Sequence, residues 1–135
     1  FVTLANARLP RFTLIMRKSY GLAAQAMMTG SSRAPLFALA WPTAEIGGMN
    51  LEAAVRLSHR AELAAIEDIE ARAERYESLL AEMYRRGSAI NSSSVHENDG
   101  VIDPVETRRY IVRGLSACEN PDPIRRGRRP NIDTW

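Results

Sequence analysis

The sequence predicts an α/β protein in which short strands and helices alternate in layers. Two short apolar runs that favour β-structure, Phe12–Met16 and Leu36–Trp41, are each followed by a break and then by residues that form helices. From residue 62 to residue 86 the apolar residues instead recur at helical spacing. This alternation is typical of strands and helices packed in layers around one core.

Composition limits the class of protein. The chain has 135 residues, a net charge of +2 and 45% hydrophobic residues, which suits one globular domain rather than a disordered chain. The single cysteine, Cys118, excludes an internal disulfide framework, and with only His59 and His96 beside it we expect no metal site. No apolar run approaches the roughly 18 to 20 residues that span a bilayer. We therefore expect a cytoplasmic protein with no membrane partner.

The two ends of the chain differ in character. The chain begins at Phe1 rather than at Met, and Phe1–Leu9 has the apolar spacing of a helix already in progress, so we expect a domain truncated at its N-terminus. Residues 121–135 are rich in Pro and Arg, and the cluster Arg125–Arg129 contributes to a pI near 9.0. Such a cluster can bind phosphates, but no nucleic-acid-binding module accompanies it. We interpret 1–120 as the domain and 121–135 as an extended basic tail with no nucleic-acid partner.

The first half of the chain has clear boundaries. Phe12–Met16 is predicted to be a buried strand, and Leu22–Met28 a helix that stops at the breaker cluster Thr29–Ser32. Leu36–Trp41 is predicted to be a second buried strand, followed at Glu45–Gly48 by a glycine-rich turn. These boundaries predict two strands separated by one short helix.

The middle of the chain is predicted to be helical. Asn50 is suited to cap a helix that runs from Leu51 towards His59. From Glu62 to Arg86, one apolar stripe with spacings of three and four residues predicts a single long packing helix. A coiled coil would have the same spacing, but the segment is under four heptads long. The stripe consists of Ile66, Ile69, Ala73, Tyr76, Leu80 and Met83, and the pairs Asp68 with Arg72 and Glu82 with Arg86 lie on its exposed side.

The last part of the chain predicts a loop, a strand and a helix. Ser92–Ser94 is predicted to be a loop, and Val101–Ile102 is predicted to be a brief strand. Asp103 is placed to cap a helix with Pro104 at its first position and Glu106 in a capping box. We expect this helix to end at Gly114.

The turn at Gly21 is the strongest candidate for chemistry. A strand that enters a helix there leaves the first helical N–H groups without intrahelical partners, which favours an anion. Small side chains at Ala23 and Ala24 would let a ligand approach the backbone. A lone glycine between a strand and a helix is also common in purely structural turns, and the spacing alone leaves both interpretations open. Glu45 could orient nearby amides or pair with a cation, and we interpret it as structural.

Three segments together carry a family resemblance. Arg17–Ala23 (RKSYGLA), Ala40–Ile46 (AWPTAEI) and Val101–Arg108 (VIDPVETR) resemble, in order and spacing, the C-terminal half of the carboxyltransferase (β) subunit of biotin-dependent acyl-CoA carboxylases. This family includes acetyl-CoA and propionyl-CoA carboxylase β subunits. Arg129–Ile132 also resembles the end of these subunits, so the resemblance spans nearly the whole chain.

The resemblance implies a fold and a site. The fold would be crotonase-like (ClpP/crotonase), a superhelix of ββα units, with this chain as the C-terminal part of the biotin-side domain and one long packing helix. The backbone amides of Leu22 and Ala23 would form an oxyanion hole for the enolate of biotin. Leu22 stands where the family usually has Gly, which adds a side chain near a crowded turn. The residues implied to bind biotin are Tyr20, Gly21, Ala24 and Gln25.

The resemblance also implies an activity and partners. We expect carboxyl transfer from carboxybiotin on a carrier protein to an acyl-CoA, with an active site between domains of two subunits. The partners would be biotin carboxylase, the biotin carboxyl carrier, the N-terminal carboxyltransferase domain and further copies of the chain. Without these partners we expect the isolated fragment to be inactive. Two alternatives remain: an acyl-CoA decarboxylase subunit of the same family, and a non-catalytic crotonase-like assembly fragment.

Overall fold

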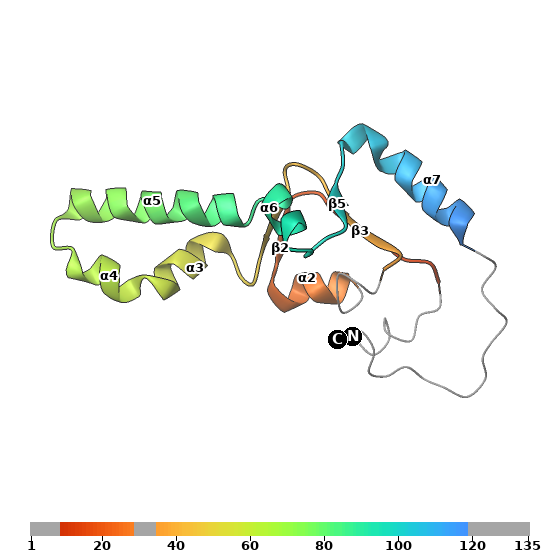
Figure 1. Cartoon of the computed structure of the whole chain (residues 1–135). Helices are drawn as coiled ribbons and strands as arrows, with labels where there is room; N and C mark the ends of the chain where they lie inside the picture. The colour runs from red at the N-terminus through yellow and green to blue at the C-terminus, as the bar shows by residue number, and fades with distance from the viewer. Residues whose placement is uncertain (1–8, 29–34, 119–135) are drawn as a thin grey trace, which may run out of the picture.

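The fold is known from a computed structural model that describes residues 9–28 and 35–118 (Figure 1). The expected helix at Phe1–Leu9 (apart from Leu9 itself), the breaker cluster Thr29–Ser32 and the tail 121–135 lie outside the described residues. The elements in chain order are β1 (Phe12–Ile15), β2 (Lys18–Tyr20), α2 (Gly21–Met27), β3 (Phe37–Ala40), β4 (Glu45–Gly47), α3 (Leu51–Ser58), α4 (Arg60–Ala65), α5 (Ile69–Arg86), α6 (Ala89–Ser94), β5 (Gly100–Val101), the 3₁₀ turn η1 (Pro104–Glu106) and α7 (Thr107–Ala117).

Two small parallel sheets form the centre of the molecule. The first has the order β1-β3-β5, with Ile15 paired to Ala40 and Ala40 paired to Val101. The second consists of β2 and β4, with Tyr20 paired to Gly47. Parallel strands require crossover connections, and here those connections carry the helices. The predicted strands at β1, β3 and β5 are confirmed to within a residue or two.

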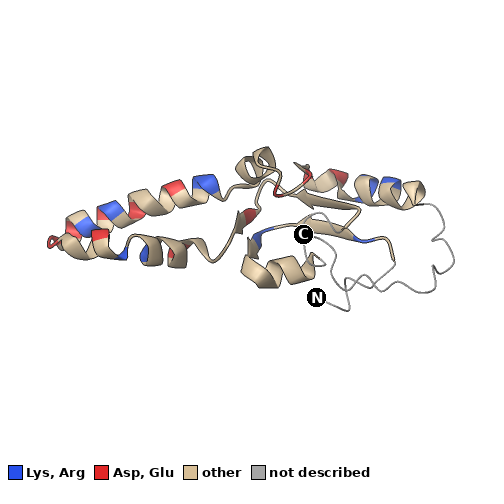
Figure 2. Ribbon diagram, turned by 60° about the horizontal axis from the view of Figure 1, so that its bottom comes forward, with Lys and Arg blue, Asp and Glu red and all other residues tan. Residues whose placement is uncertain are grey.

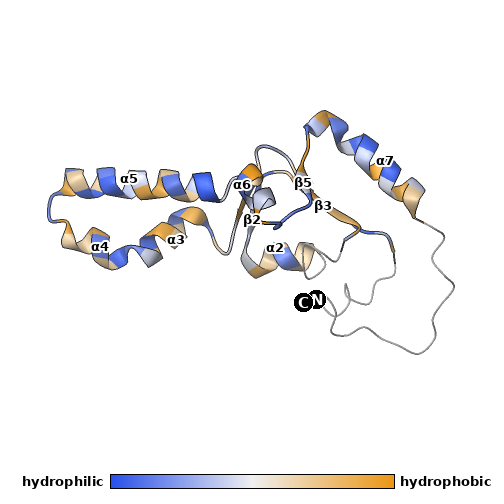
Figure 3. Cartoon of the chain, viewed as in Figure 1, coloured by the Kyte–Doolittle hydropathy of each residue, from blue (hydrophilic) through white to orange (hydrophobic). Residues whose placement is uncertain are grey.

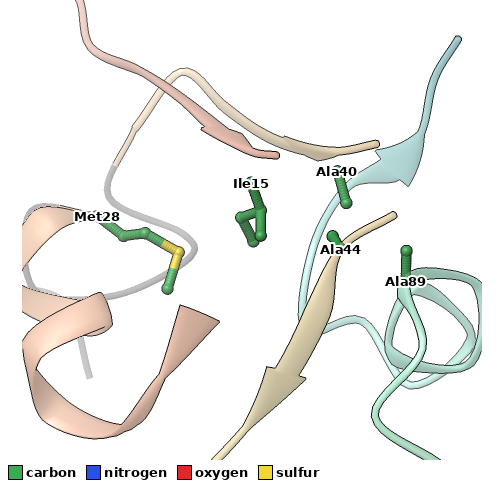
Figure 4. Packing of buried hydrophobic residues seen from close by; sticks show 5 residues of the cluster. All are labelled: Ile15, Met28, Ala40, Ala44 and Ala89. Atoms are coloured by element: carbon green, nitrogen blue, oxygen red, sulfur yellow. The ribbon is translucent and has the colours of Figure 1, made fainter. Parts of the chain in front are cut away.

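The core lies where the two sheets meet α2 and α6. Its buried members are Ile15, Met28, Ala40, Ala44 and Ala89, which converge in Figure 4. Three of the five are alanines, so the backbones around them approach closely, and the first sheet, α6 and the end of α2 are held together at short range. This packing fixes the position of α2 relative to the sheets.

Helix α7 packs against the aromatic side of the first sheet. The rings of Phe12 and Phe37 lie with centroids 4.8 Å apart, and Tyr110 of α7 meets Phe37 edge-on at 6.5 Å. Gly114 lies inside this helix rather than at its end, so the predicted end at Gly114 is wrong. A Cβ at Gly114 would lie 2.6 Å from Phe12 Cε1 and 2.9 Å from Phe37 Cε1. The glycine is therefore needed for the close approach of the helix and not for a C-terminal cap.

Helices α3, α4 and α5 form a projecting hairpin, which we call the arm (residues 51–86; Figure 1). Asn50 caps α3 as predicted, because its side chain accepts a hydrogen bond of 3.0 Å from Ala53 N. Positively and negatively charged residues both occur along α5, as the ribbon colours of Figure 2 show. The arm therefore has a mixed charged surface rather than a field of one sign.

The prediction of one continuous helix from Glu62 to Arg86 is wrong. The helix is interrupted at residues 66–68, where Asp68 adopts an extended backbone and its side chain accepts a hydrogen bond of 2.9 Å from Glu70 N. Asp68 is thus the N-cap of α5 and not the partner of Arg72, whose guanidinium donates to the Glu67 carbonyl at 3.3 Å. The predicted Glu82–Arg86 ion pair is confirmed.

The predicted apolar stripe on this segment is only partly correct. Ile66, Tyr76, Leu80 and Met83 are half-buried, whereas Ile69 is 77% exposed and Ala73 is also exposed. The buried residue of α5 is Leu79, which the stripe did not include. Figure 3 shows apolar segments along α5 and on α3 and α4. The interruption before Ile69 separates the two ends of the predicted stripe, so they do not share one buried face.

Two further predictions about local structure are wrong. The first three residues of the predicted turn Glu45–Gly48 form strand β4. This strand forms by pairing with β2, which is distant in the sequence, so no local pattern indicates it. The segment predicted as the loop Ser92–Ser94 is the end of α6, whose N-cap Ser88 accepts from Asn91 N at 3.4 Å. No helix within the described residues is long and apolar enough to cross a membrane.

Candidate functional site

The site is built around the turn from β2 into α2. Gly21 is the first residue of α2 and has φ of +65°, a left-handed conformation that side chains disfavour. A Cβ there would also meet the Gly48 carbonyl oxygen at 3.0 Å. No side chain caps the first turn of α2, which begins directly after Tyr20. The opening amides of this helix are therefore left for another acceptor.

Tyr20 and Glu45 link the two strands that carry this turn. The Tyr20 hydroxyl donates to Glu45 Oε2 at 2.5 Å, and Glu45 N donates to the Arg17 carbonyl at 2.5 Å. Burial first, and then the hydrogen bond and negative charge of Glu45, raise the pKa of Tyr20 well above its usual value. Tyr20 is therefore a permanent donor at neutral pH.

A hollow of about 200 Å³ opens beside the turn, and we call it the Gly21 hollow. Three glycines and an alanine are among its lining residues, so a ligand can approach main-chain groups closely. Apolar side chains and a few polar ones complete it. The lining residues are Ser19, Gly21, Ala24, Gln25, Met28, Ile46, Gly47, Gly48 and Glu97.

A second, larger hollow of about 400 Å³ lies at the base of the arm. It shares Ile46, Gly47, Gly48 and Glu97 with the Gly21 hollow, so the β4–α3 connection forms a wall between the two. Arg86 and Met83 of α5 contribute its arm side.

The structure brings some of the predicted site residues together and leaves others outside the hollow. Gly21, Ala24 and Gln25 line the Gly21 hollow. Tyr20 is half-buried in the β2–β4 contact, and Ala23 is exposed and does not line the hollow. Leu22, whose side chain raised the question of crowding, is 70% exposed and does not line the hollow. A side chain at this position therefore leaves the hollow open.

Sequence reasoning missed several lining residues. Gly47 and Gly48 were interpreted only as a turn, although two adjacent glycines also signal a close backbone approach. Glu97 follows α6 and reaches the hollow through the return of the chain towards β5, which no local pattern reveals. Within residues 9–28 and 35–118, no group of three or more His, Cys, Asp or Glu side chains is arranged to hold a metal ion.

Comparison with known proteins decides the family. The family model described as the carboxyl transferase domain matches residues 2–128. The chain belongs to this carboxyl transferase domain family. Among curated relatives, the biotin-dependent acetyl-/propionyl-coenzyme A carboxylase beta6 subunit of Mycobacterium tuberculosis is 38% identical over 124 residues, covering 91% of the chain and 25% of that subunit. The methylmalonyl-CoA carboxyltransferase 12S subunit of Propionibacterium freudenreichii is 36% identical over 116 residues, covering 82% of the chain and 21% of that subunit.

Solved structures agree with this assignment. A single-chain, multi-domain long-chain acyl-CoA carboxylase matches with a TM-score of 0.69 and 44% identity, over 83% of the chain and 11% of that protein. The transcarboxylase 12S hexamer with bound methylmalonyl-coenzyme A matches with a TM-score of 0.72 and 27% identity, over 94% of the chain and 25% of that protein. The α/β, crotonase-like fold of this carboxyl transferase domain is thereby confirmed. The chain spans about a quarter of the length of the curated relatives.

Proposed function

We propose that this chain forms the biotin side of a carboxyltransferase active site and, in the complete protein, takes part in carboxyl transfer from carboxybiotin to an acyl-CoA. One observation carries the proposal: the uncapped first turn of α2 opens at Gly21 beside a hollow that is partly lined by glycine and alanine. Membership of the carboxyl transferase family supports carboxyl transfer as the reaction in which this site takes part. Relatives of the chain are named as biotin-dependent carboxylase subunits.

The residues of the hollow fit a biotin ring. Gly21 and Ala24 permit close approach to the backbone, and Gln25 adds a polar side chain to the hollow. Met28 and Ile46 provide apolar surface for the hydrocarbon part of the group. We propose Gly21, Ala24 and Gln25 of the hollow, together with Tyr20 directly before the turn, as the biotin-binding set, with carboxybiotin supplying an activated carboxyl group when it is bound.

The chemical contribution of the chain would come from its backbone. The amides of Leu22 and Ala23 lie in the uncapped first turn, where they can donate to an oxygen on which negative charge develops. Removing one such preorganised donor typically costs about 3 kcal/mol of transition-state stabilisation. Because the donors are main-chain groups, Leu22 in place of the family's usual Gly removes neither of them.

The partners follow from the same proposal. The acyl-CoA would be bound by the N-terminal carboxyltransferase domain, and biotin carboxylase and the biotin carboxyl carrier would load and deliver the carboxyl group. The 12S relative is described as a hexamer, which supports assembly of this chain into a homo-oligomer. We also propose a cytoplasmic location, where acyl-CoA substrates and the carrier protein would be accessible.

The test uses the protein at its natural length in a carboxyl-transfer assay with free biotin and malonyl-CoA or methylmalonyl-CoA. Ala23→Pro removes one donor, because proline has no backbone N–H. We expect a loss of roughly 100-fold or more in kcat. Leu22→Gly keeps both amides and serves as the control, with activity close to that of the unmodified protein. Full activity of Ala23→Pro would overturn the oxyanion hole.

The two alternatives give different results in the same assay. An acyl-CoA decarboxylase would release CO₂ from malonyl-CoA and show a partner-dependent reaction rather than net carboxylation of an acyl-CoA. A non-catalytic assembly fragment would show no carboxyl transfer and no binding of free biotin. The exposed side chain of Leu22 weakens this last alternative, because its strongest support was the crowding that Leu22 was expected to cause.

A further inference from the structure

We propose that Tyr20 and Glu45 act as a positioning pair, whose hydrogen bond sets the separation between the Gly21 turn and the Gly47–Gly48 wall of the hollow. The inference rests on the proposed carboxyl-transfer function of that site. It assigns to Tyr20 a role through Glu45, in addition to its place in the biotin-binding set.

The strand register explains why these two side chains meet. Lys18 is paired with Glu45, and Tyr20 is paired with Gly47. Side chains two residues apart on a strand share a face, so Tyr20 lies beside Gly47 and its hydroxyl reaches diagonally back to Glu45. A Cβ at Gly47 would lie 3.8 Å from Tyr20 Cδ1, an ordinary van der Waals distance, so the ring lies directly beside this residue.

The pair links the two halves of the Gly21 hollow. One side of the hollow comes from α2, through Gly21, Ala24 and Gln25, and the other comes from β4 and the residues after it. Gly21 follows Tyr20 directly, and Gly48 lies three residues after Glu45. A shift of β2 against β4 would therefore change the width of the hollow and the direction of the first amides of α2.

The direct backbone pairing between β2 and β4 is short. Strands β2 and β4 are three residues long each and form a separate two-stranded sheet. Two-stranded sheets are marginally stable by themselves. The hydrogen bond of 2.5 Å between Tyr20 and Glu45 adds a side-chain link across them, of the strong type in which a carboxylate is the acceptor. Burial and Glu45 keep the pKa of Tyr20 high, so the donor is present throughout the neutral range.

Four variants of the protein at its natural length test the pair. Tyr20→Phe removes the donor and keeps the ring, and Glu45→Leu removes the acceptor. Glu45→Gln keeps an oxygen that can accept from Tyr20. Tyr76→Phe is the matched control, because its hydroxyl lies on the exposed arm and accepts only a long bond of 3.4 Å from Arg56 Nε.

The expected kinetic result is specific. In carboxyl transfer with free biotin and an acyl-CoA, Tyr20→Phe lowers kcat about tenfold, the effect of roughly 1.4 kcal/mol, and raises KM for biotin. KM for the acyl-CoA stays unchanged. Glu45→Leu matches Tyr20→Phe, the double variant is no worse than either, and Glu45→Gln retains most of the activity. Tyr76→Phe behaves as the unmodified protein.

A second measurement does not depend on activity. Hydrogen exchange of the amides at residues 24–27, the first in α2 that have intrahelical acceptors, is expected to accelerate in Tyr20→Phe and Glu45→Leu, and to stay near normal in Glu45→Gln. Unchanged exchange and unchanged biotin kinetics in Tyr20→Phe would overturn the pair. So would a loss of activity in Glu45→Gln as large as in Glu45→Leu.

The two proposals fail in distinguishable ways. If the unmodified protein transfers no carboxyl group, the proposed function is wrong, and the exchange pattern alone then decides whether the pair positions the turn. If the unmodified protein is active but Tyr20→Phe lowers only the folded fraction, with KM for biotin unchanged, the pair is merely structural and the inference is wrong.

Discussion

Gly21 combines two constraints at one residue, and they predict the effect of adding a methyl group. Its φ of +65° costs an alanine about 1 to 2 kcal/mol, and the new Cβ would lie 3.0 Å from the Gly48 carbonyl oxygen. We expect Gly21→Ala to lower the melting temperature by several degrees and to reduce carboxyl transfer. Gly48→Ala is the thermal control, because nothing lies within 4 Å of its Cβ position. Equal melting temperatures for the two variants would contradict the assigned strain.

Deprotonation of Tyr20 is expected to lower the stability of the protein at alkaline pH. Its pKa in the folded protein is raised above the ordinary value near 10, so the folded state holds the phenolic proton more tightly than the unfolded state does. The stabilisation is complete below about pH 10 and decreases as the pH rises from there towards the folded pKa. We expect the melting temperature of the unmodified protein to fall more steeply above pH 10 than that of Tyr20→Phe. Parallel curves would show that Tyr20 does not contribute.

At the same scale, the candidate site was only partly predictable from the sequence. The strand-to-helix turn at Gly21 was visible because a glycine follows an apolar run and precedes residues that form helices. Gly48 closes the hollow through the pairing of β2 with the distant strand β4, and Glu97 does so through the return of the chain from α6 towards β5. Local patterns carry no information about such pairing. The oxyanion and biotin roles remain predictions drawn from the family resemblance.

At the scale of the element, α7 shows a glycine whose role is packing. A helix propensity argument predicts that Gly114→Ala stabilises α7 by up to about 1 kcal/mol. The structure predicts the opposite, because the new Cβ would lie 2.6 Å from Phe12 Cε1, and overpacking a core typically costs about 1 to 3 kcal/mol. We expect a lower melting temperature for Gly114→Ala and little change for the exposed control Ser116→Ala. A rise with Gly114→Ala would show that the ring pair moves freely.

The arm illustrates what periodicity can and cannot predict. The spacing of apolar residues correctly indicated a long helical segment, but a side chain that caps a helix and one that pairs within a helix look alike in the sequence. Asp68 was assigned to an ion pair with Arg72, yet its carboxylate caps the start of α5. The bend at residues 66–68 turns α4 back against α5, and this tertiary contact overrides the local preference for one helix. Strands β2 and β4 were not predicted either. Each has only three residues, which are too few side chains to show an alternating pattern.

At the scale of the whole molecule, the chain exposes apolar side chains on several elements. Met27 of α2 is 85% exposed, Val105 of η1 is 79% exposed, and Ile69 at the start of α5 is 77% exposed. The arm also projects from the two sheets, with α3 and α4 as one side of the hairpin and α5 as the other (Figure 1). Side chains of this kind are expected where a fold is completed by further protein, as in the longer relatives of which the chain spans about a quarter.

This distribution predicts the behaviour of the 135-residue chain in solution. Apolar side chains exposed on α2, η1 and α5 gain free energy when they are buried, at about 25 cal/mol per Å², so isolated copies are expected to associate or to precipitate. Sedimentation velocity should show species larger than a monomer whose proportion rises with concentration. Met27→Lys and Val105→Lys place charges on two of the exposed positions and should reduce this association, whereas Glu77→Lys on the exposed side of α5 should not. A monodisperse, stable monomer over the whole concentration range would mean that these side chains do not mediate association and that the chain folds as a self-sufficient unit.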